Sequence, residues 1–170
     1  MDAVVVVESW FGCTRQVADA VAQGLASAGV PTDVVDVGDA PPAFAAGTVL
    51  LVVGAPTHAF GMSTRSTRAD AARRPGAVAT ATGRGVREWV ASLQDAAGLR
   101  VATFDTRVRH PRLPGSAAAA AARALGRRGA VPLLRPQSFW VDDTAGPLLD
   151  GETHRAHAWG RSLAAALRDS

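Results

Sequence analysis

The sequence VVVVESWFGCT, from Val4 to Thr14, predicts a buried strand that turns directly into a helix. Its four valines are β-branched and apolar, which favours a strand buried on both faces of a parallel sheet. Small and hydroxyl-bearing residues follow at Ser9, Gly12 and Thr14, and apolar residues then recur at helical spacing (Val17, Ala18, Val21, Ala22 and Leu25). Backbone N–H groups at such a helix start can hold a phosphate group. From this stretch alone, an ordinary capped turn is the alternative.

Length and composition predict one globular domain spanning residues 1–170. We find no stretch of about 20 apolar residues and no signal-peptide pattern, so we expect no association with a membrane. The single cysteine, Cys13, excludes an internal disulfide framework and is typical of a reducing cytoplasm. We therefore expect a cytoplasmic protein.

The basic composition is a weak indication of nucleic-acid binding. The sequence pI is about 10.8, yet the net charge is only +3. All 18 basic residues are arginine, and the chain has no Lys, Asn, Ile or Tyr. These four residue types share AT-rich codons, so a GC-rich genome explains the composition more simply. We expect no specific nucleic-acid partner, with a nonspecific nucleic-acid surface as the alternative.

Strand and helix patterns alternate along the chain and predict an α/β fold. We expect strands at 4–7, 30–37, 48–53, 99–104 and 131–141, and Pro132 and Pro136 should bend the last one or place it at an edge. We expect helices at 15–28, 84–97, 116–128 and 151–168, with a short helix and a loop within 64–83. This order predicts a parallel sheet covered by helices on both faces.

Ligands bind such sheets at the carboxyl ends of the strands. The loops that leave these ends are expected at 8–14, 55–63 and 105–115. The absence of lysine excludes a P-loop, and Asp19 stands where a Cys-x5-Arg phosphatase needs arginine. Gly54 occupies the position of a receiver-domain aspartate.

Other catalytic patterns are incomplete as well. Arg65 replaces the second glycine of a nucleophile elbow, and Glu88 replaces the last glycine of a dinucleotide fingerprint. His154 and His157 lie one helical turn apart without a third ligand close in sequence, so we expect no metal site. Cys13 has no evident acid–base partner, and we interpret it as a small loop residue.

Two loops resemble those of the flavodoxin-like family. SWFGCT at 9–14 is similar to the flavodoxin phosphate loop, usually S/T-x-T-G-N-T, and PTHAFGMS at 56–63 is similar to the second flavin loop. STRAD at 66–70 resembles a bacterial flavodoxin-like subgroup. The resemblance implies a three-layer αβα fold with a five-stranded parallel sheet in strand order 2-1-3-4-5. It also implies bound FMN and electron transfer through this flavin to a redox partner protein or a small electron acceptor.

The resemblance also implies roles for particular residues. The hydroxyls of Ser9 and Thr14, with the backbone N–H groups of residues 11–14, would bind the FMN phosphate. Phe60 would contact the isoalloxazine ring, and the Gly61 peptide would turn toward flavin N5. The implied cofactor-binding set is Ser9, Trp10, Phe11, Gly12, Cys13, Thr14, Pro56, Thr57, His58, Phe60, Gly61, Asp105, Thr106 and Arg107.

The sequence departs from the flavodoxin pattern, which leaves two alternatives open. Phe11 replaces a threonine, Cys13 replaces an asparagine, and the third loop offers only His110 for stacking on the flavin. One alternative is an FMN-dependent quinone or nitro reductase that takes hydride from a nicotinamide, with phosphates received by arginines (Arg65, Arg68, Arg107 and Arg109). The other is a flavin-free regulatory or interaction module. We expect a monomer or weak homodimer.

Overall fold

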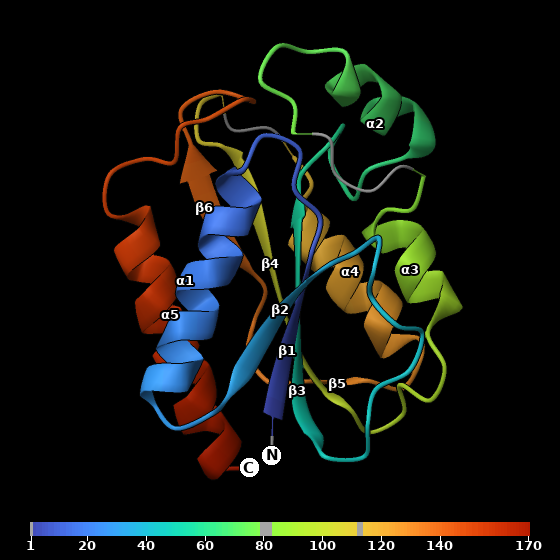
Figure 1. The fold of residues 1–170 in the computed structure, drawn as a ribbon, viewed down its shortest axis with the longest axis vertical. Helices are drawn as coiled ribbons and strands as arrows, with labels where there is room; N and C mark the ends of the chain where they lie inside the picture. Colours follow the sequence, from blue (N-terminus) through green and yellow to red (C-terminus); the bar gives the residue numbers. More distant parts are fainter. Residues whose placement is uncertain (1, 79–82, 112–113) are drawn as a thin grey trace.

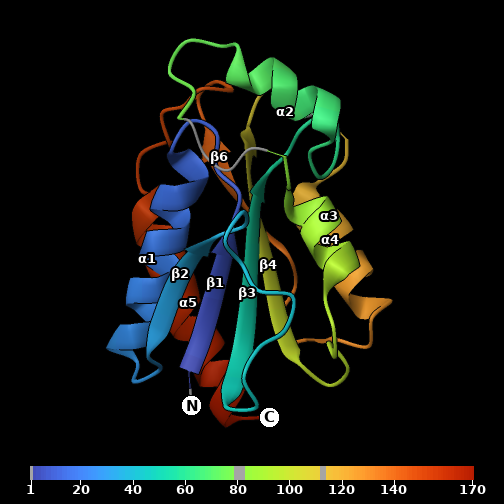
Figure 2. The same cartoon turned by 45° about the vertical axis from the view of Figure 1, so that its right-hand side comes forward.

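The chain folds into three layers, which we describe from a computed structural model of residues 2–78, 83–111 and 114–170. Parts of the predicted segments 64–83 and 105–115 lie outside the described residues. Helices α1 (Cys13–Ser27) and α5 (Glu152–Arg168) cover one face of a central sheet (Figures 1 and 2). Helices α3 (Val86–Ser92) and α4 (Ala117–Gly126) cover the other face, and α2 (Arg65–Ala72) lies beyond the carboxyl ends of the strands.

All pairings between the strands of the sheet are parallel, and the strand order is β2-β1-β3-β4-β5. The strands are β1 (Asp2–Val7), β2 (Thr32–Asp36), β3 (Thr48–Pro56), β4 (Arg100–Val108), β5 (Val131–Pro132) and β6 (Gln137–Val141). Strand order and fold class are confirmed. The predicted strand 131–141 is two short edge pieces, β5 beside the start of β4 and β6 beside its end. Pro132 and Pro136 explain the break, because proline cannot donate to the ladder.

The helices agree with the sequence patterns except at the end of α3. Ser116 caps α4, since its Oγ accepts a hydrogen bond from the Ala119 N–H at 3.1 Å. The predicted helix 84–97 was too long: it ends at Ser92, and the Gln94 N–H donates to the Pro42 carbonyl instead. Among the described residues, no helix has the length and apolar content needed to cross a membrane.

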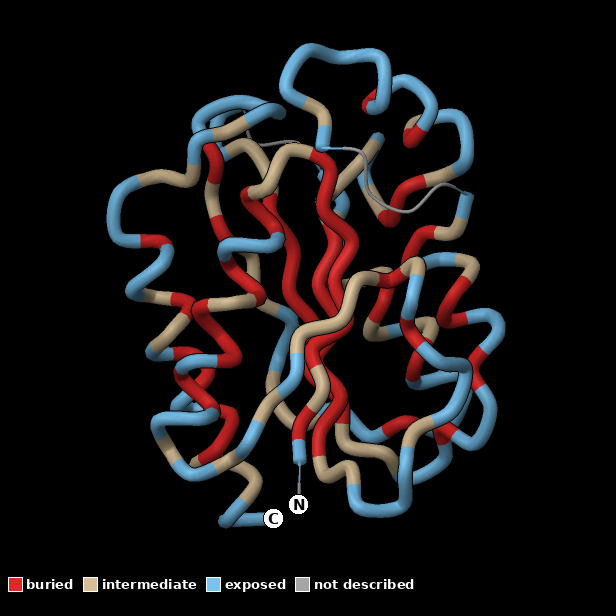
Figure 3. Tube along the Cα trace, viewed as in Figure 1, coloured by how far each residue is buried: buried red, intermediate tan, exposed pale blue. Residues whose placement is uncertain are grey.

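The core is divided between the two faces of the sheet (Figure 3). Val5 and Val7 of β1 pack with Trp159 under α1 and α5, whereas Val6 packs with Trp89 on the opposite face. This division is what four consecutive valines predict for a strand without a polar face. Figure 3 shows buried residues along the central strands and on the inner sides of the helices.

Strands β3 and β4 run further toward the site than the sequence predicts. Strand β4 continues through Asp105 to Val108 rather than ending at residue 104. Asp105 was expected in a loop, yet it is buried and accepts a hydrogen bond from the Ala118 N–H of α4. Thr103, within the predicted strand, is also buried and donates to the Ala118 carbonyl. The longer strands place Pro56 and Thr106 side by side at the carboxyl edge of the sheet.

Candidate functional site

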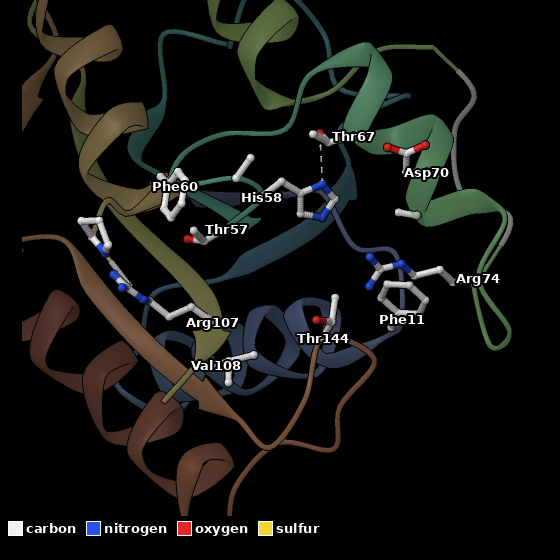
Figure 4. Close-up of a pocket in the computed structure, with 13 residues that line it drawn as sticks. Phe11, Thr57, His58, Phe60, Thr67, Asp70, Arg74, Arg107, Val108 and Thr144 are labelled. Carbon is white, nitrogen blue, oxygen red and sulfur yellow. Dashed lines mark hydrogen bonds between the residues drawn. The ribbon is translucent and has the colours of Figure 1, made fainter. Parts of the chain in front are cut away.

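A cavity of about 360 Å³ opens at the carboxyl ends of the central strands. Each of the three predicted loops contributes a side chain to its wall: Phe11 from the first, Phe60 from the second and Arg107 from the third (Figure 4). A smaller cavity of about 60 Å³ shares lining residues with it and reaches Cys13 and Thr14 at the start of α1. The three loops are therefore brought together as predicted.

The first loop ends in a helix start whose N-cap residue is a glycine. Gly12 is the N-cap of α1, with a left-handed φ of 89°, and it has no side chain with which to cap the helix. Glycine adopts this conformation at low cost, and it leaves the N–H groups of Cys13 and Thr14 for an external acceptor, whereas the N–H of Arg15 donates to Ser9 Oγ. This donor set fits an anion such as a phosphate group.

The hydroxyl groups around this helix start already have partners within the protein. Ser9 Oγ accepts a hydrogen bond from the Arg15 N–H at 3.2 Å, so it supports the first turn of α1. Thr14 Oγ1 lies 2.7 Å from Thr106 Oγ1, which links the first loop to the third. A threonine hydroxyl that donates in such a pair keeps lone pairs for other donors, and one that accepts can still donate to an anion.

Cys13 is a packing residue of this loop. It is buried, and a Cβ added at Gly146 would lie 2.6 Å from its Sγ. Burial raises the pKa of the Cys13 thiol, and a hydrogen bond with the Leu148 backbone opposes only part of this rise. A neutral thiol is a poor nucleophile, which agrees with our interpretation of Cys13 as a small loop residue.

The second loop forms a tight turn that presents an aromatic ring. Paired backbone hydrogen bonds join His58 and Gly61 at 2.9 and 3.0 Å, and Ala59 and Phe60 between them have positive φ values of 42° and 74°. Positive φ is uncommon for residues with a side chain. The left-handed residues of the turn are therefore these two rather than Gly61. Phe60 is 57% exposed at the cavity wall.

His58 points into the cavity from the base of this turn (Figure 4). Its Nδ1 lies 3.3 Å from Thr67 Oγ1 of α2. Burial lowers the pKa of His58, Arg68 and Arg74 lower it further, and Glu8 opposes them. The imidazole is therefore neutral near pH 7.

The third segment contributes unequally to the site. Asp105 is fully buried: its Oδ2 accepts hydrogen bonds from Thr57 Oγ1, Ser116 Oγ and the Ala118 N–H at 2.9, 2.5 and 3.1 Å. It therefore secures the start of α4 and does not line either cavity. Arg107 lines both cavities, and its guanidinium group donates to the Gly115 carbonyl at 2.5 Å.

Helix α2 forms a wall that sequence reasoning missed. Four of its side chains or those just after it line the larger cavity, namely Thr67, Asp70, Ala71 and Arg74. Arg74 and Phe11 both line this cavity (Figure 4). The only signal in the sequence was the resemblance at 66–70, because α2 has a polar composition and buries only Arg68 and Ala71.

A buried polar network connects the first two loops behind the cavity. Glu8 is 3% exposed; its carboxylate accepts hydrogen bonds from Trp10 Nε1 at 3.0 Å, Ser63 Oγ at 2.5 Å and the Val86 N–H at 2.8 Å. Arg68 donates to Ser63 Oγ at 3.0 Å and pairs with the Glu88 carboxylate at 3.1 Å.

This network corrects our interpretation of Arg68, which is 4% exposed and faces neither a ligand nor solvent. Burial raises the pKa of Glu88, but hydrogen bonds from Arg68 and the Gly85 N–H outweigh it, so the pKa lies below its usual value. An acidic residue directly after four consecutive valines was the available signal for Glu8.

Most of the predicted site residues lie together. Ten of them line one or both cavities: Trp10, Phe11, Cys13, Thr14, Pro56, Thr57, His58, Phe60, Thr106 and Arg107. Ser9, Gly12 and Gly61 belong to the adjoining loops without lining either cavity. Over the parts of the chain that the structure describes, no group of three or more His, Cys, Asp or Glu residues could hold a metal ion.

By sequence, the chain matches no protein-family model and no curated protein. By structure, it is similar to flavodoxin 1 from Bacillus cereus, with a TM-score of 0.69 and 19% identity over 99% of this chain and 98% of that one. It is also similar to a flavodoxin from the domain Archaea, with a TM-score of 0.67 and 18% identity over 99% of both chains. Rubredoxin oxygen:oxidoreductase from Desulfovibrio gigas matches 99% of this chain with 36% of its own, at a TM-score of 0.65 and 14% identity. The chain therefore has the flavodoxin-like fold.

Proposed function

We propose that this protein binds FMN and transfers electrons through it to a partner protein or a small acceptor. The observation that carries the proposal is the start of α1 at Gly12, an N-cap residue without a side chain, which adjoins a cavity with two phenylalanines in its wall. A phosphate and an aromatic ring system on one ligand would use both features. Similarity to flavodoxins supports the same cofactor.

The first loop would hold the phosphate. Backbone N–H groups of residues 11–14 provide neutral donors, and the positive end of the α1 dipole adds to their attraction for an anion. The Thr14 hydroxyl is the nearest side-chain donor, since it lines the smaller cavity beside the start of α1. Ser9 would act mainly by supporting the turn, because its Oγ accepts the Arg15 N–H.

The larger cavity would hold the flavin ring. Phe11 and Phe60 offer aromatic faces, and His58, Thr57 and Arg107 offer polar atoms around them. A bound flavin supplies the redox chemistry, and the protein supplies position and electrostatics. A cytoplasmic location agrees with a chain whose single cysteine is a buried thiol.

Two matched variants test the phosphate site. Thr14→Val and Thr106→Val each remove the same contact between hydroxyls, but only the first removes the hydroxyl beside the start of α1. We expect the wild type and Thr106→Val to bind FMN more tightly than riboflavin, and Thr14→Val to lose about tenfold of this preference, the value of one hydrogen bond to a charged group. Titration of tryptophan fluorescence measures both ligands. Equal binding of FMN and riboflavin by the wild type would contradict the phosphate site.

Reduction by a nicotinamide is a second candidate function. It is favoured by two arginines on the cavity wall, Arg74 and Arg107, which could receive the ligand's phosphates. Of the arginines that the sequence suggested for this role, only Arg107 lines the cavity. Rapid bleaching of the bound flavin by NADPH alone would establish this function, whereas an electron carrier needs a reductase. A protein that takes up no FMN would instead be a flavin-free module.

A further inference from the structure

His58 lies on the cavity wall, where protonation of its imidazole would add a positive charge next to a bound ligand. Its ring projects into the cavity between the second loop and α2, opposite Phe11 and Thr144 (Figure 4). One ring nitrogen, Nδ1, is held by Thr67 at 3.3 Å. The other nitrogen, Nε2, is on the side of the ring away from this contact and is the atom that a ligand would meet.

The hydrogen-bond distances around Thr67 favour one tautomer of His58. Thr67 Oγ1 donates its single proton to the Thr64 carbonyl at 3.1 Å and accepts from the Thr64 N–H at 2.9 Å. Thr64 Oγ1 is closer to Ser66 Oγ, at 3.0 Å, than to Thr67 Oγ1, at 3.4 Å. The Thr64 carbonyl is the nearer acceptor for the Thr67 hydroxyl proton, at 3.1 Å against 3.3 Å for His58 Nδ1. With the proton on this carbonyl, Thr67 Oγ1 accepts from His58 Nδ1 and Nε2 carries the lone pair, which is the tautomer that we infer.

Charged groups from several elements surround this imidazole. Arg68 and Arg74 of the α2 segment disfavour a second positive charge, and burial acts in the same direction. Glu8, at the end of β1, opposes them, but its carboxylate is already bound by three donors. Asp70 and Arg107 complete the charged residues of the cavity wall. His58 is thus a neutral base that becomes easier to protonate when negative charge enters the cavity.

We propose that His58 Nε2 is the proton acceptor of this cavity and takes up one proton when a bound flavin is reduced. The inference rests on the proposed FMN function. An external donor supplies two electrons to the flavin, and one proton from solvent goes to the flavin, which leaves one added negative charge. A second proton from solvent then binds Nε2, so reduction adds no net charge to the site. His58 acts beside the flavin as a positioning and proton-accepting group.

The pH dependence of the flavin midpoint potential tests this proton uptake. Each proton taken up in a two-electron reduction changes the equilibrium constant tenfold per pH unit, which is about 30 mV. We expect the wild-type potential to fall about 30 mV per pH unit more steeply than that of His58→Gln, over the pH range between the His58 pKa values of the oxidised and reduced protein. Thr67→Ser keeps the hydroxyl and should retain the wild-type slope. Equal slopes for wild type and His58→Gln would overturn the proposal.

A second measurement does not need bound flavin. The chain contains only four histidines, so ¹⁵N NMR of histidine side chains can be assigned by comparison with His58→Gln. At pH 7 the flavin-free wild type should show His58 as the neutral tautomer with the proton on Nδ1. A proton on Nε2 instead would overturn the proposal whether or not FMN binds. If the tautomer is as expected but no FMN binds, the proposed function fails while the geometry of His58 stands.

Discussion

Replacement of Glu8 tests whether the network behind the cavity organises the site. Glu8→Ala would remove a buried carboxylate and leave the N–H groups of Trp10 and Val86 without their acceptor. Arg68 would lose the carboxylate that it reaches through Ser63, although it would keep Glu88. Removing one partner from a buried charged network costs about 3–5 kcal/mol. For a chain of this size the melting temperature would fall by roughly 10 °C.

Urea denaturation of Glu8→Ala, Glu8→Gln and the control Glu88→Ala measures these effects. Glu8→Gln keeps the shape of the side chain but turns one acceptor oxygen into an NH₂ group that faces a donor of the network. We therefore expect an intermediate loss of folding stability of about 1–3 kcal/mol. The Glu88 side chain is 41% exposed, and without it Arg68 still donates to Ser63 Oγ and the Gly83 carbonyl. Its removal, which also breaks the hydrogen bond from the Gly85 N–H, should therefore cost less, about 1–2 kcal/mol. If Glu8→Ala lost no more stability than Glu88→Ala, the network would not stabilise the site as we argue.

Three further predictions concern stability. The pKa of His58 in the folded protein lies below 6.5, so the unfolded chain binds more protons than the folded protein between pH 6.5 and that lower pKa. As the pH falls through this range, the free energy of unfolding of the wild type should therefore decrease more than that of His58→Gln, as measured by urea titrations at several pH values. Gly24→Ala should cost about 3 kcal/mol or more of folding stability, because its Cβ would lie 2.1 Å from the His157 carbonyl oxygen. The control Gly126→Ala meets nothing within 4 Å and should be neutral or stabilising by about 0.5–1 kcal/mol. Equal melting temperatures for the two variants would refute this prediction. Asp105→Ala should cost about 2–4 kcal/mol of folding stability. Asp105→Asn should cost about half of that, because the amide oxygen can accept the same three hydrogen bonds. If chemical denaturation showed Asp105→Asn to be less stable than Asp105→Ala, the role of Asp105 in securing the start of α4 would be contradicted.

The sequence predicted the parts of the fold in which apolar periodicity and burial agree. The valines of β1 and the apolar stripe of α1 indicated two adjacent elements, and the structure buries both as expected. It predicted less well where polar residues are buried. Asp105 suggested a loop, yet its hydrogen bond from the Ala118 N–H of α4 allows β4 to continue. Hydrogen bonds between β4 and α4 join residues 13 and 15 positions apart, and no pattern within either segment of the sequence predicts them.

The candidate site shows the same division. The first loop could be predicted because a buried strand, small and hydroxyl-bearing residues and a helical apolar stripe follow one another in the sequence. The contribution of α2 could not, since Thr67, Asp70 and Arg74 reach the cavity only through the packing of a short polar helix. Arg68 and Glu8 pair through Ser63, and this contact spans 55 residues between Glu8 and Ser63.

The visible absorption spectrum of the purified protein tests the central claim most directly. We expect a yellow protein that releases FMN on heating, and whose flavin-free form takes up added FMN with a change in tryptophan fluorescence. A colourless protein whose tryptophan fluorescence is unchanged by FMN would contradict the assignment of the cavity to a flavin.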